Sequence, residues 1–131
     1  MKFFEPLTPE IENIATATVD GAYKVHKALG PGLLESVYES CLAYELRKRC
    51  LEVRTQLDLP ITYDGMTIET GLRPDIVIAD LVVVEVKAVE QVHPVHHAQV
   101  LTYLKLMNLR LGLLINFNVP MISKGIRRII L

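Results

Sequence analysis

The chain has 131 residues, of which half are hydrophobic and 22% are charged. This length supplies one hydrophobic core, and the composition excludes an intrinsically disordered chain. The formal net charge of −1 counts only mildly against a protein that coats nucleic acid through bulk positive charge, because a nuclease needs only a local basic patch. We therefore expect a single domain over residues 1–131.

The cysteines and the N-terminus indicate the compartment. Cys41 and Cys50 are nine residues apart and match neither a zinc-binding nor a redox motif, so we expect free thiols in a reducing environment. The opening residues MKFFEPLTPE lack the apolar run of a signal peptide, and the apolar stretches elsewhere are too short to cross a bilayer. These features predict a cytoplasmic protein with no membrane partner.

The N-terminal part of the chain predicts two helices. Thr8-Pro9-Glu10 is typical of a helix start, and Gly30-Pro31-Gly32 is typical of a helix end. Apolar residues between them recur at helical spacing up to Leu29 and indicate one buried face. A second helix is expected from about Leu34 to Cys50. The residues predicted to face the core from this helix are Leu34, Val37, Cys41 and Leu42.

After the second helix the periodicity changes to that of strands. Gln56–Tyr63 and Met66–Gly71 flank Asp64-Gly65, a pair that favours the positive φ angles of a tight hairpin turn. Pro74–Ile78 and Leu81–Lys87 follow, and the latter is apolar on both faces, as in the centre of a covered sheet. The remaining expected elements are a helix from Val95 to Asn108 and strands at Arg110–Asn116 and Ile126–Ile130. This order predicts an α/β fold with a mixed β-sheet flanked by helices.

Three charged residues stand out because they interrupt these buried strands. Asp75 follows a proline, and Glu85 and Lys87 come ten and twelve residues later. Glu85 and Lys87 project from the same face of one strand, and charges among valines are costly unless they are paired or bound. If the segments around Asp75 and Glu85 pair as neighbouring strands, their carboxylates converge. Mg²⁺ prefers such oxygen ligands.

These residues resemble a known family. Pro74-Asp75, a spacer and then Glu85-Val86-Lys87 resemble the PD-(D/E)XK motif of the restriction-endonuclease-like nucleases. Gly32-Leu33-Leu34-Glu35-Ser36-Val37-Tyr38 is similar to the signature of the GxxExxY proteins, a group in the same superfamily. The likeness extends from roughly Ile14 to Asn118. It implies a restriction-endonuclease-like core of the αβββαβ type and a divalent-metal-dependent nuclease that hydrolyses phosphodiester bonds in DNA or RNA.

The resemblance implies a role for each residue of the motif. Asp75 and Glu85 would bind the metal, and the carbonyl of Val86 would complete its protein ligands. The metal would be Mg²⁺, with Mn²⁺ able to substitute, and a second metal ion stays open. Lys87 would be catalytic, because it would hold the attacking water and offset negative charge on the phosphate.

Three helical residues complete the implied catalytic set. Glu35, on the second helix, would support the metal or its water, and Gln99 and Tyr103 would lie beside the site from the third helix. Each also has a plain structural interpretation. Glu35 suits the positive end of a helix dipole, and Gln99 and Tyr103 could be ordinary polar groups at an interface.

Other residues have open interpretations too. Asp75 could be a turn residue after proline, and Glu85 with Lys87 could form a cross-strand ion pair. His93, His96 and His97 lack the spacing of a helical zinc site and are expected at the surface or beside the site, where His96 or His97 could contact phosphate. His26 suits the end of its helix. Further candidate phosphate contacts, or solvated charges, are Lys105, Arg110, Lys124, Arg127 and Arg128.

Three functions are compatible with these residues. The first is a nuclease, with nucleic acid as its partner. The second is a non-catalytic binding or accessory module of a nucleic-acid-processing or defence system, which the small size and neutral charge favour. The third is a metal-dependent phosphoesterase for small molecules. The apolar segments Leu111–Ile115 and Ile129-Ile130-Leu131 could continue into a second copy, so a homodimer is a further expectation.

Overall fold

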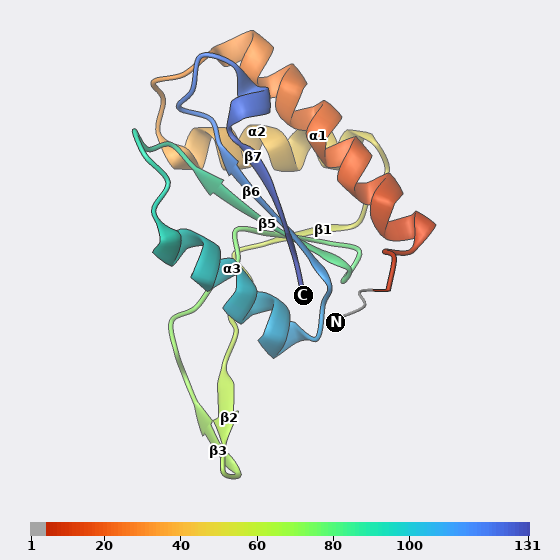
Figure 1. Ribbon diagram of the computed structural model, residues 1–131, viewed down its shortest axis with the longest axis vertical. Helices are drawn as coiled ribbons and strands as arrows, with labels where there is room; N and C mark the ends of the chain where they lie inside the picture. Colours follow the sequence, from red (N-terminus) through yellow and green to blue (C-terminus); the bar gives the residue numbers. More distant parts are fainter. Residues whose placement is uncertain (1–4) are drawn as a thin grey trace.

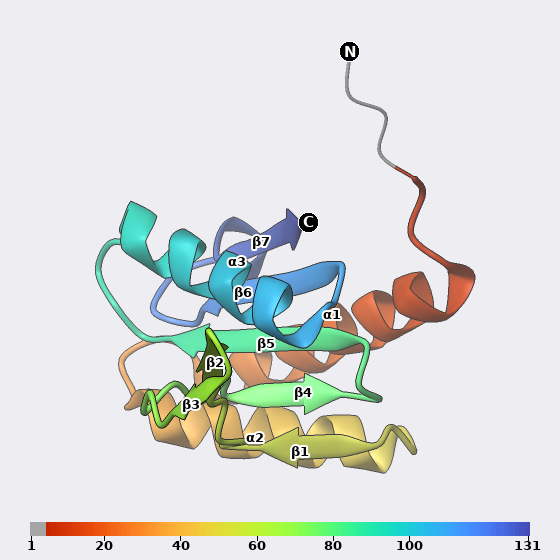
Figure 2. The same cartoon turned by 90° about the horizontal axis from the view of Figure 1, so that it is seen from below.

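A computed structural model describes residues 5–131 as a mixed five-stranded sheet covered by helices on both faces, with a separate two-stranded hairpin (Figures 1 and 2). The sheet order is β1-β4-β5-β6-β7, in which only β5 and β6 are parallel neighbours. The predicted α/β class is confirmed. The elements are α1 (Pro9–Leu29), α2 (Glu35–Lys48), β1 (Val53–Thr55), β2 (Ile61–Tyr63), β3 (Met66–Ile68), β4 (Ile76–Ile78), β5 (Val82–Lys87), α3 (Pro94–Met107), β6 (Leu111–Asn116), the short 3-10 helix η1 (Ile122–Lys124) and β7 (Ile126–Ile130).

Helix α1 begins and ends where the sequence predicts. The Thr8 side chain accepts a hydrogen bond from the backbone N–H of Ile11 at 3.3 Å, and Pro9 occupies the first turn. At the other end Gly30 adopts a φ of 66°, which ends the helix. Leu29 was expected in the buried face and is 39% exposed. It is the last residue of the helix and lies at the border of the surface that α2 covers.

The predicted buried face of helix α2 is confirmed only in part: Leu42 is fully buried, as expected. Leu34 is 74% exposed and is the N-cap, Val37 is 38% exposed, and Cys41 is only half-buried. The prediction followed the apolar residues, whereas the buried face starts from Tyr38 and repeats at helical spacing. Its buried residues are Tyr38, Leu42, Ala43, Glu45 and Leu46. Because Glu45 is charged, the spacing of apolar residues alone did not indicate that this face is buried.

The strand region is divided more finely than predicted. Asp64 and Gly65 form the expected turn, with φ angles of 49° and 76°, but the strands that flank it are only three residues each. The first half of the predicted strand Gln56–Tyr63 is not part of this hairpin. A short strand immediately before it, β1, pairs instead with β4 at the edge of the main sheet. Figure 1 shows the hairpin standing out from the body of the protein.

The two faces of β5 contact different cores, and this places the charged residues. Val84 and Val86 belong to the cluster formed with α1 and α2, whereas Val83 packs in the cluster formed with α3. Because side chains alternate along a strand, Glu85 and Lys87 share the face of Val83. The charged end of β5 therefore lies on the side of the sheet that α3 covers.

Helix α3 lies close to the sheet because β6 has a glycine beneath it. A Cβ atom at Gly112 would collide with the Val100 side chain of α3. Val100 and Leu104 are fully buried in this contact, and Tyr103 is 2% exposed. The close approach brings the middle of α3 near the charged end of β5.

Two expectations drawn from composition can also be compared with the structure. Cys41 and Cys50 both carry free thiols, as expected. Among the helices formed by residues 5–131, none is both long enough and apolar enough to cross a membrane.

Candidate active site

Asp75, directly before β4, lies beside Glu85 of β5. Ile76 of β4 is opposite Val84 of β5 in the antiparallel ladder, so the next pair along is Asp75 and Glu85. Glu85 Oε1 accepts a hydrogen bond from the Asp75 backbone N–H, and Asp75 Oδ2 accepts one from the Val86 backbone N–H, both at 2.9 Å. One oxygen of each carboxylate is thus fixed by backbone, and the other oxygen is left for a different partner.

Lys87 places a positive charge between two acids. Its Nζ is 3.8 Å from Glu85 Oε2 and 3.9 Å from Glu35 Oε1, where Glu35 is the first residue of α2. Both distances are long for an ion pair, so the ammonium group is not held tightly by either carboxylate. The structure therefore brings together Asp75 from the segment before β4, Glu85 and Lys87 from β5, and Glu35 from α2.

The charges of this group are not balanced by the protein alone. Glu85 is 3% exposed, and burial, together with the charge of Asp75, raises its pKa to about 8. Burial also raises the pKa of Asp75, against the opposing effects of the Val86 N–H and Lys87. Two carboxylates that are both desolvated and adjacent resist holding two negative charges. An additional cation beside them would relieve this cost.

The donor set suits a hard divalent cation. Asp75 Oδ1 and Glu85 Oε2 are the oxygens without a backbone hydrogen bond, and Mg²⁺ is usually held by one or two carboxylates together with water and substrate oxygens. Within residues 5–131 no group of three or more His, Cys, Asp and Glu side chains is arranged to hold a metal ion. Carbonyl groups, water and substrate would therefore supply the remaining ligands, and the residues fit such an ion.

Tyr38 organises the loop that leads into Glu35. Its hydroxyl donates a hydrogen bond to the Gly30 carbonyl at 2.6 Å and accepts one from the Leu33 N–H at 3.1 Å. Its ring stacks on Phe117, with centroids 4.6 Å apart. The tyrosine of the GxxExxY-like stretch thus fixes the start of α2, a structural role that the sequence pattern did not reveal.

Of the two candidate residues on α3, Tyr103 is buried and lies within the electrostatic influence of the acids. Burial raises the pKa of Tyr103 to about 12, and the charges of Glu85 and Asp75 add to this effect. The tyrosine is therefore a neutral hydroxyl beside two carboxylates. Gln99, one turn earlier, is half-buried, and in the described part of the chain its side chain forms no hydrogen bond with the acids or with Lys87.

Two polar residues that sequence reasoning missed lie against Asp75. Gln56 Nε2 is 2.8 Å from Glu39 Oε1 and 3.4 Å from Asp75 Oδ1. Burial raises the pKa of Glu39, the Gln56 hydrogen bond opposes this, and the charges of Asp75 and Glu35 raise it further. The four-residue spacing of Glu35 and Glu39 on one helix was the available signal for Glu39. No sequence pattern indicated Gln56.

The histidines divide into different roles. The backbone N–H of His93 donates to His96 Nδ1 at 3.1 Å at the start of α3, while His97 is exposed. Burial and the charge of Lys87 lower the pKa of His96. His26 lies apart from them and donates from Nε2 to the Val119 carbonyl at 2.7 Å. Of the four, His96 is the one whose environment includes the charges of the site.

Two of the five candidate phosphate contacts have structural partners instead. Arg128 pairs with Glu12 at 2.7 Å, and Arg110 donates to the backbone carbonyls of Glu5 and Pro6. These two guanidinium groups hold the N-terminal segment against the last strand. The other three, Lys105, Lys124 and Arg127, are exposed.

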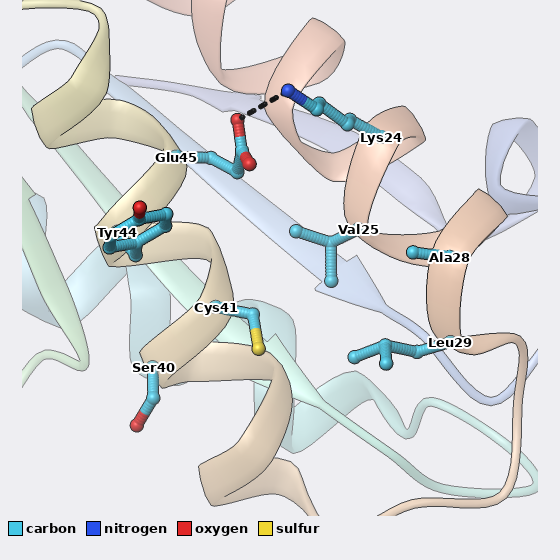
Figure 3. Close-up of a pocket in the computed structure, with 8 residues that line it drawn as sticks. All are labelled: Lys24, Val25, Ala28, Leu29, Ser40, Cys41, Tyr44 and Glu45. Atoms are coloured by element: carbon cyan, nitrogen blue, oxygen red, sulfur yellow. Dashed lines mark ion pairs between the residues drawn. The ribbon is translucent and has the colours of Figure 1, made fainter.

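A largely apolar cavity lies between α1 and α2, and neither Asp75 nor Glu85 lines it (Figure 3). It measures about 310 Å³, and Val25, Leu29, Cys41 and Tyr44 contribute much of its wall. Glu45 closes one end, 3.6 Å from Lys24 Nζ. None of the residues singled out from the sequence as catalytic or metal-binding lines this cavity, so it is separate from the acidic group.

Comparison with protein families identifies the class of this domain. Residues 12–129 match the family model described as the PD-(D/E)XK nuclease superfamily. The match covers nearly the whole chain, and the protein belongs to this superfamily, whose nucleases generally use divalent metal ions. No curated protein and no solved structure matches the chain. The narrower assignment to the GxxExxY proteins rests on the sequence signature alone and stays a prediction.

Proposed function

We propose that this protein is a Mg²⁺-dependent phosphodiester hydrolase that acts on DNA or RNA. The observation that carries the proposal is the reciprocal hydrogen bonding of Asp75 and Glu85, which holds the half-buried Asp75 carboxylate next to the buried Glu85 carboxylate, beside the Lys87 ammonium group. A protein gains no stability from two adjacent desolvated acids, whereas a cation-binding site needs them. The membership of the chain in a nuclease superfamily supports this interpretation.

In this proposal the acids bind the ion and the lysine acts on the reacting groups. Asp75, Glu85 and the carbonyl of Val86 would hold Mg²⁺. When bound, the ion polarises a phosphoryl oxygen and lowers the pKa of a water molecule. Lys87 orients the attacking water, and its fixed positive charge stabilises the negative charge that develops on the phosphate.

The helical residues would act around this centre. The Glu35 carboxylate lies 3.9 Å from Lys87 Nζ, and the exposed Glu35 side chain can hold water beside the lysine. Tyr103 keeps its proton and can donate a hydrogen bond toward the acids. Gln99, at the half-buried rim, can contact the sugar or phosphate of the substrate.

The direct test is cleavage of a panel of single-stranded and double-stranded DNA and RNA, with Mg²⁺ or Mn²⁺. We expect cleavage that EDTA abolishes and that Asp75→Asn protein, verified as folded by circular dichroism, lacks. Cleavage that survives both treatments would contradict the proposal. Metal binding without cleavage of any polynucleotide would favour the accessory module, and cleavage confined to small phosphodiesters would favour the small-molecule phosphoesterase.

We further infer that the chain acts as one domain, in the cytoplasm, and as a homodimer. The position of β7 at the edge of the sheet, with Ile130 44% exposed and the following residue Leu131 40% exposed, supports the assembly, because an edge strand can pair with a second copy. Light scattering at micromolar concentration tests it. A monomeric mass would contradict the dimer and leave the proposed chemistry untouched.

A further inference from the structure

Gln56 links Asp75 to a second acid of helix α2. Its Nε2 donates to Glu39 Oε1 at 2.8 Å and lies 3.4 Å from Asp75 Oδ1. Its backbone N–H also donates to the Asp75 carbonyl at 3.1 Å. Because both side-chain acceptors are carboxylates, the nitrogen of the amide must face them, so the orientation of this amide is fixed by chemistry.

The backbone of Gln56 is bent to make these contacts. Gln56 directly follows β1 and has a φ of 52°, a conformation that is uncommon for a residue other than glycine. This bend directs its N–H to the Asp75 carbonyl while its side chain reaches Asp75 Oδ1. Asp75 is therefore held at its backbone and at both carboxylate oxygens, since Val86 binds Oδ2.

We propose that Glu39 and Gln56 are positioning residues for the metal-binding carboxylate of Asp75, an inference that rests on the proposed function. The amide nitrogen of Gln56 has two hydrogens, one for each carboxylate. Glu39 anchors the amide from α2, and the amide sets the direction of Asp75 Oδ1, the oxygen free of backbone contact. The relay also connects α2, which carries Glu35, to the strand that carries Asp75.

Outer partners of this kind act through the ligand that they orient. Loss of such a partner typically weakens metal binding or activity by about 10- to 100-fold, while the ligands themselves remain. The Glu39 carboxylate is needed here as a hydrogen-bond acceptor, and its charge is not needed. A glutamine at this position keeps an acceptor oxygen, whereas an alanine does not, so the two substitutions should differ.

The test is calorimetric titration of Mn²⁺ into the full-length protein and its variants. The informative variants are Glu39→Ala, Glu39→Gln and Gln56→Met, the last of which keeps chain length and removes the amide. Glu52→Gln is the matched control, because Glu52 is an exposed acid directly before β1 whose backbone carbonyl, not its side chain, forms the contact with Ala79. Thermal unfolding of each variant in EDTA reports any general loss of structure.

We expect Glu39→Ala and Gln56→Met to weaken Mn²⁺ binding by about 10-fold or more, with Glu39→Gln and the control within about 3-fold of wild type. Binding by Gln56→Met equal to that of wild type would overturn the inference. Equal weakening in Glu39→Gln and Glu39→Ala would also overturn it, because charge would then be the cause. Wild-type protein that binds no Mn²⁺ at millimolar concentration would instead remove the proposed function itself.

Discussion

Glu45 and Glu85 are both buried, at 8% and 3% exposure, but their neighbours differ. Glu45, between α1 and α2, is surrounded by three cations: Arg49 at 2.8 Å, and Lys24 and Lys48 at 3.6 Å each. The hydrogen bond from Arg49 lowers the pKa of Glu45. Glu85 has one lysine at 3.8 Å and shares its site with another acid, and its pKa is raised to about 8.

The difference separates a structural acid from a candidate ligand. The protein supplies cations for Glu45, so this side chain is satisfied by the fold and joins two helices. For Glu85 the protein supplies a second carboxylate and only one ammonium group, at 3.8 Å, so the negative charges of the two acids are not balanced. Strong perturbation by burial and by a like charge is typical of functional sites. The experiments below compare these two regions.

The largest contrast is expected between two lysines. Lys87→Ala should reduce nuclease activity by about 10²- to 10³-fold, as is typical when one preorganised electrostatic group is removed. Lys24→Ala, which removes a cation from Glu45 instead, should leave activity unchanged. Initial cleavage rates with saturating Mg²⁺ measure both. Similar losses of activity in Lys87→Ala and Lys24→Ala protein would contradict the assignment of Lys87, and not Lys24, to the active site.

The next effect is on stability in EDTA. Glu85 binds a proton more tightly in the folded state, where its pKa is about 8, than in the unfolded state, where it is near 4.5. Its stabilising contribution is therefore complete below pH 4.5 and is lost as the pH rises toward 8. Glu85→Gln should remove this slope and stabilise the metal-free protein at pH 8 by on the order of 4 kcal/mol. Urea denaturation from pH 5 to pH 8.5 measures it, and a slope unchanged in the variant would contradict the assignment.

Bound Mg²⁺ should stabilise the protein through the site around Glu85 and not through the region around Glu45. Mg²⁺ at ten times its Kd should stabilise the wild-type protein by about 1.4 kcal/mol, because it binds only the folded state. It should have no such effect on Glu85→Gln protein. Thermal unfolding with and without Mg²⁺, with Ca²⁺ as a second ion, gives this result. Equal stabilisation of both proteins would locate the ion elsewhere.

The smallest expected effect concerns the helix pair. Glu45→Gln should lower the Tm at pH 7, because its three cations lose their partner, and activity should be unchanged. The pKa of Glu45 is lowered, so its contribution is present above its unfolded pKa of 4.5 and is lost as the pH falls below it. The Tm difference should therefore shrink on acidification, which is the reverse of the trend for Glu85. A difference that grows at low pH would contradict this.

Local sequence patterns predicted much of the fold. The capped first helix, the Asp64-Gly65 turn and the apolar central strand each follow from neighbouring residues, and the structure has all three. The buried face of α2 was predicted only in part: Leu42 is buried, whereas Leu34 and Val37 are exposed. Glu45 is buried there because cations from α1 and from its own helix surround it. The spacing of apolar residues along a helix cannot predict such a contact.

The residues of the candidate site were also predicted only in part from the sequence. Glu85 and Lys87 were selected because charge inside an apolar strand is conspicuous, and Asp75 because it follows Pro74 ten residues before Glu85. Gln56 and Glu39 were missed because their contacts span 19 and 17 residues and depend on the pairing of the short strand β1 with β4. Three residues of strand carry too little pattern to predict that pairing.

The most direct test of the central claim is a crystal structure of the protein grown with Mn²⁺, using anomalous scattering to locate the ion. We expect an anomalous peak between Asp75 Oδ1 and Glu85 Oε2, with Lys87 close by. A structure in which millimolar Mn²⁺ leaves this position without a peak, or in which the ion occupies a different place, would contradict the account.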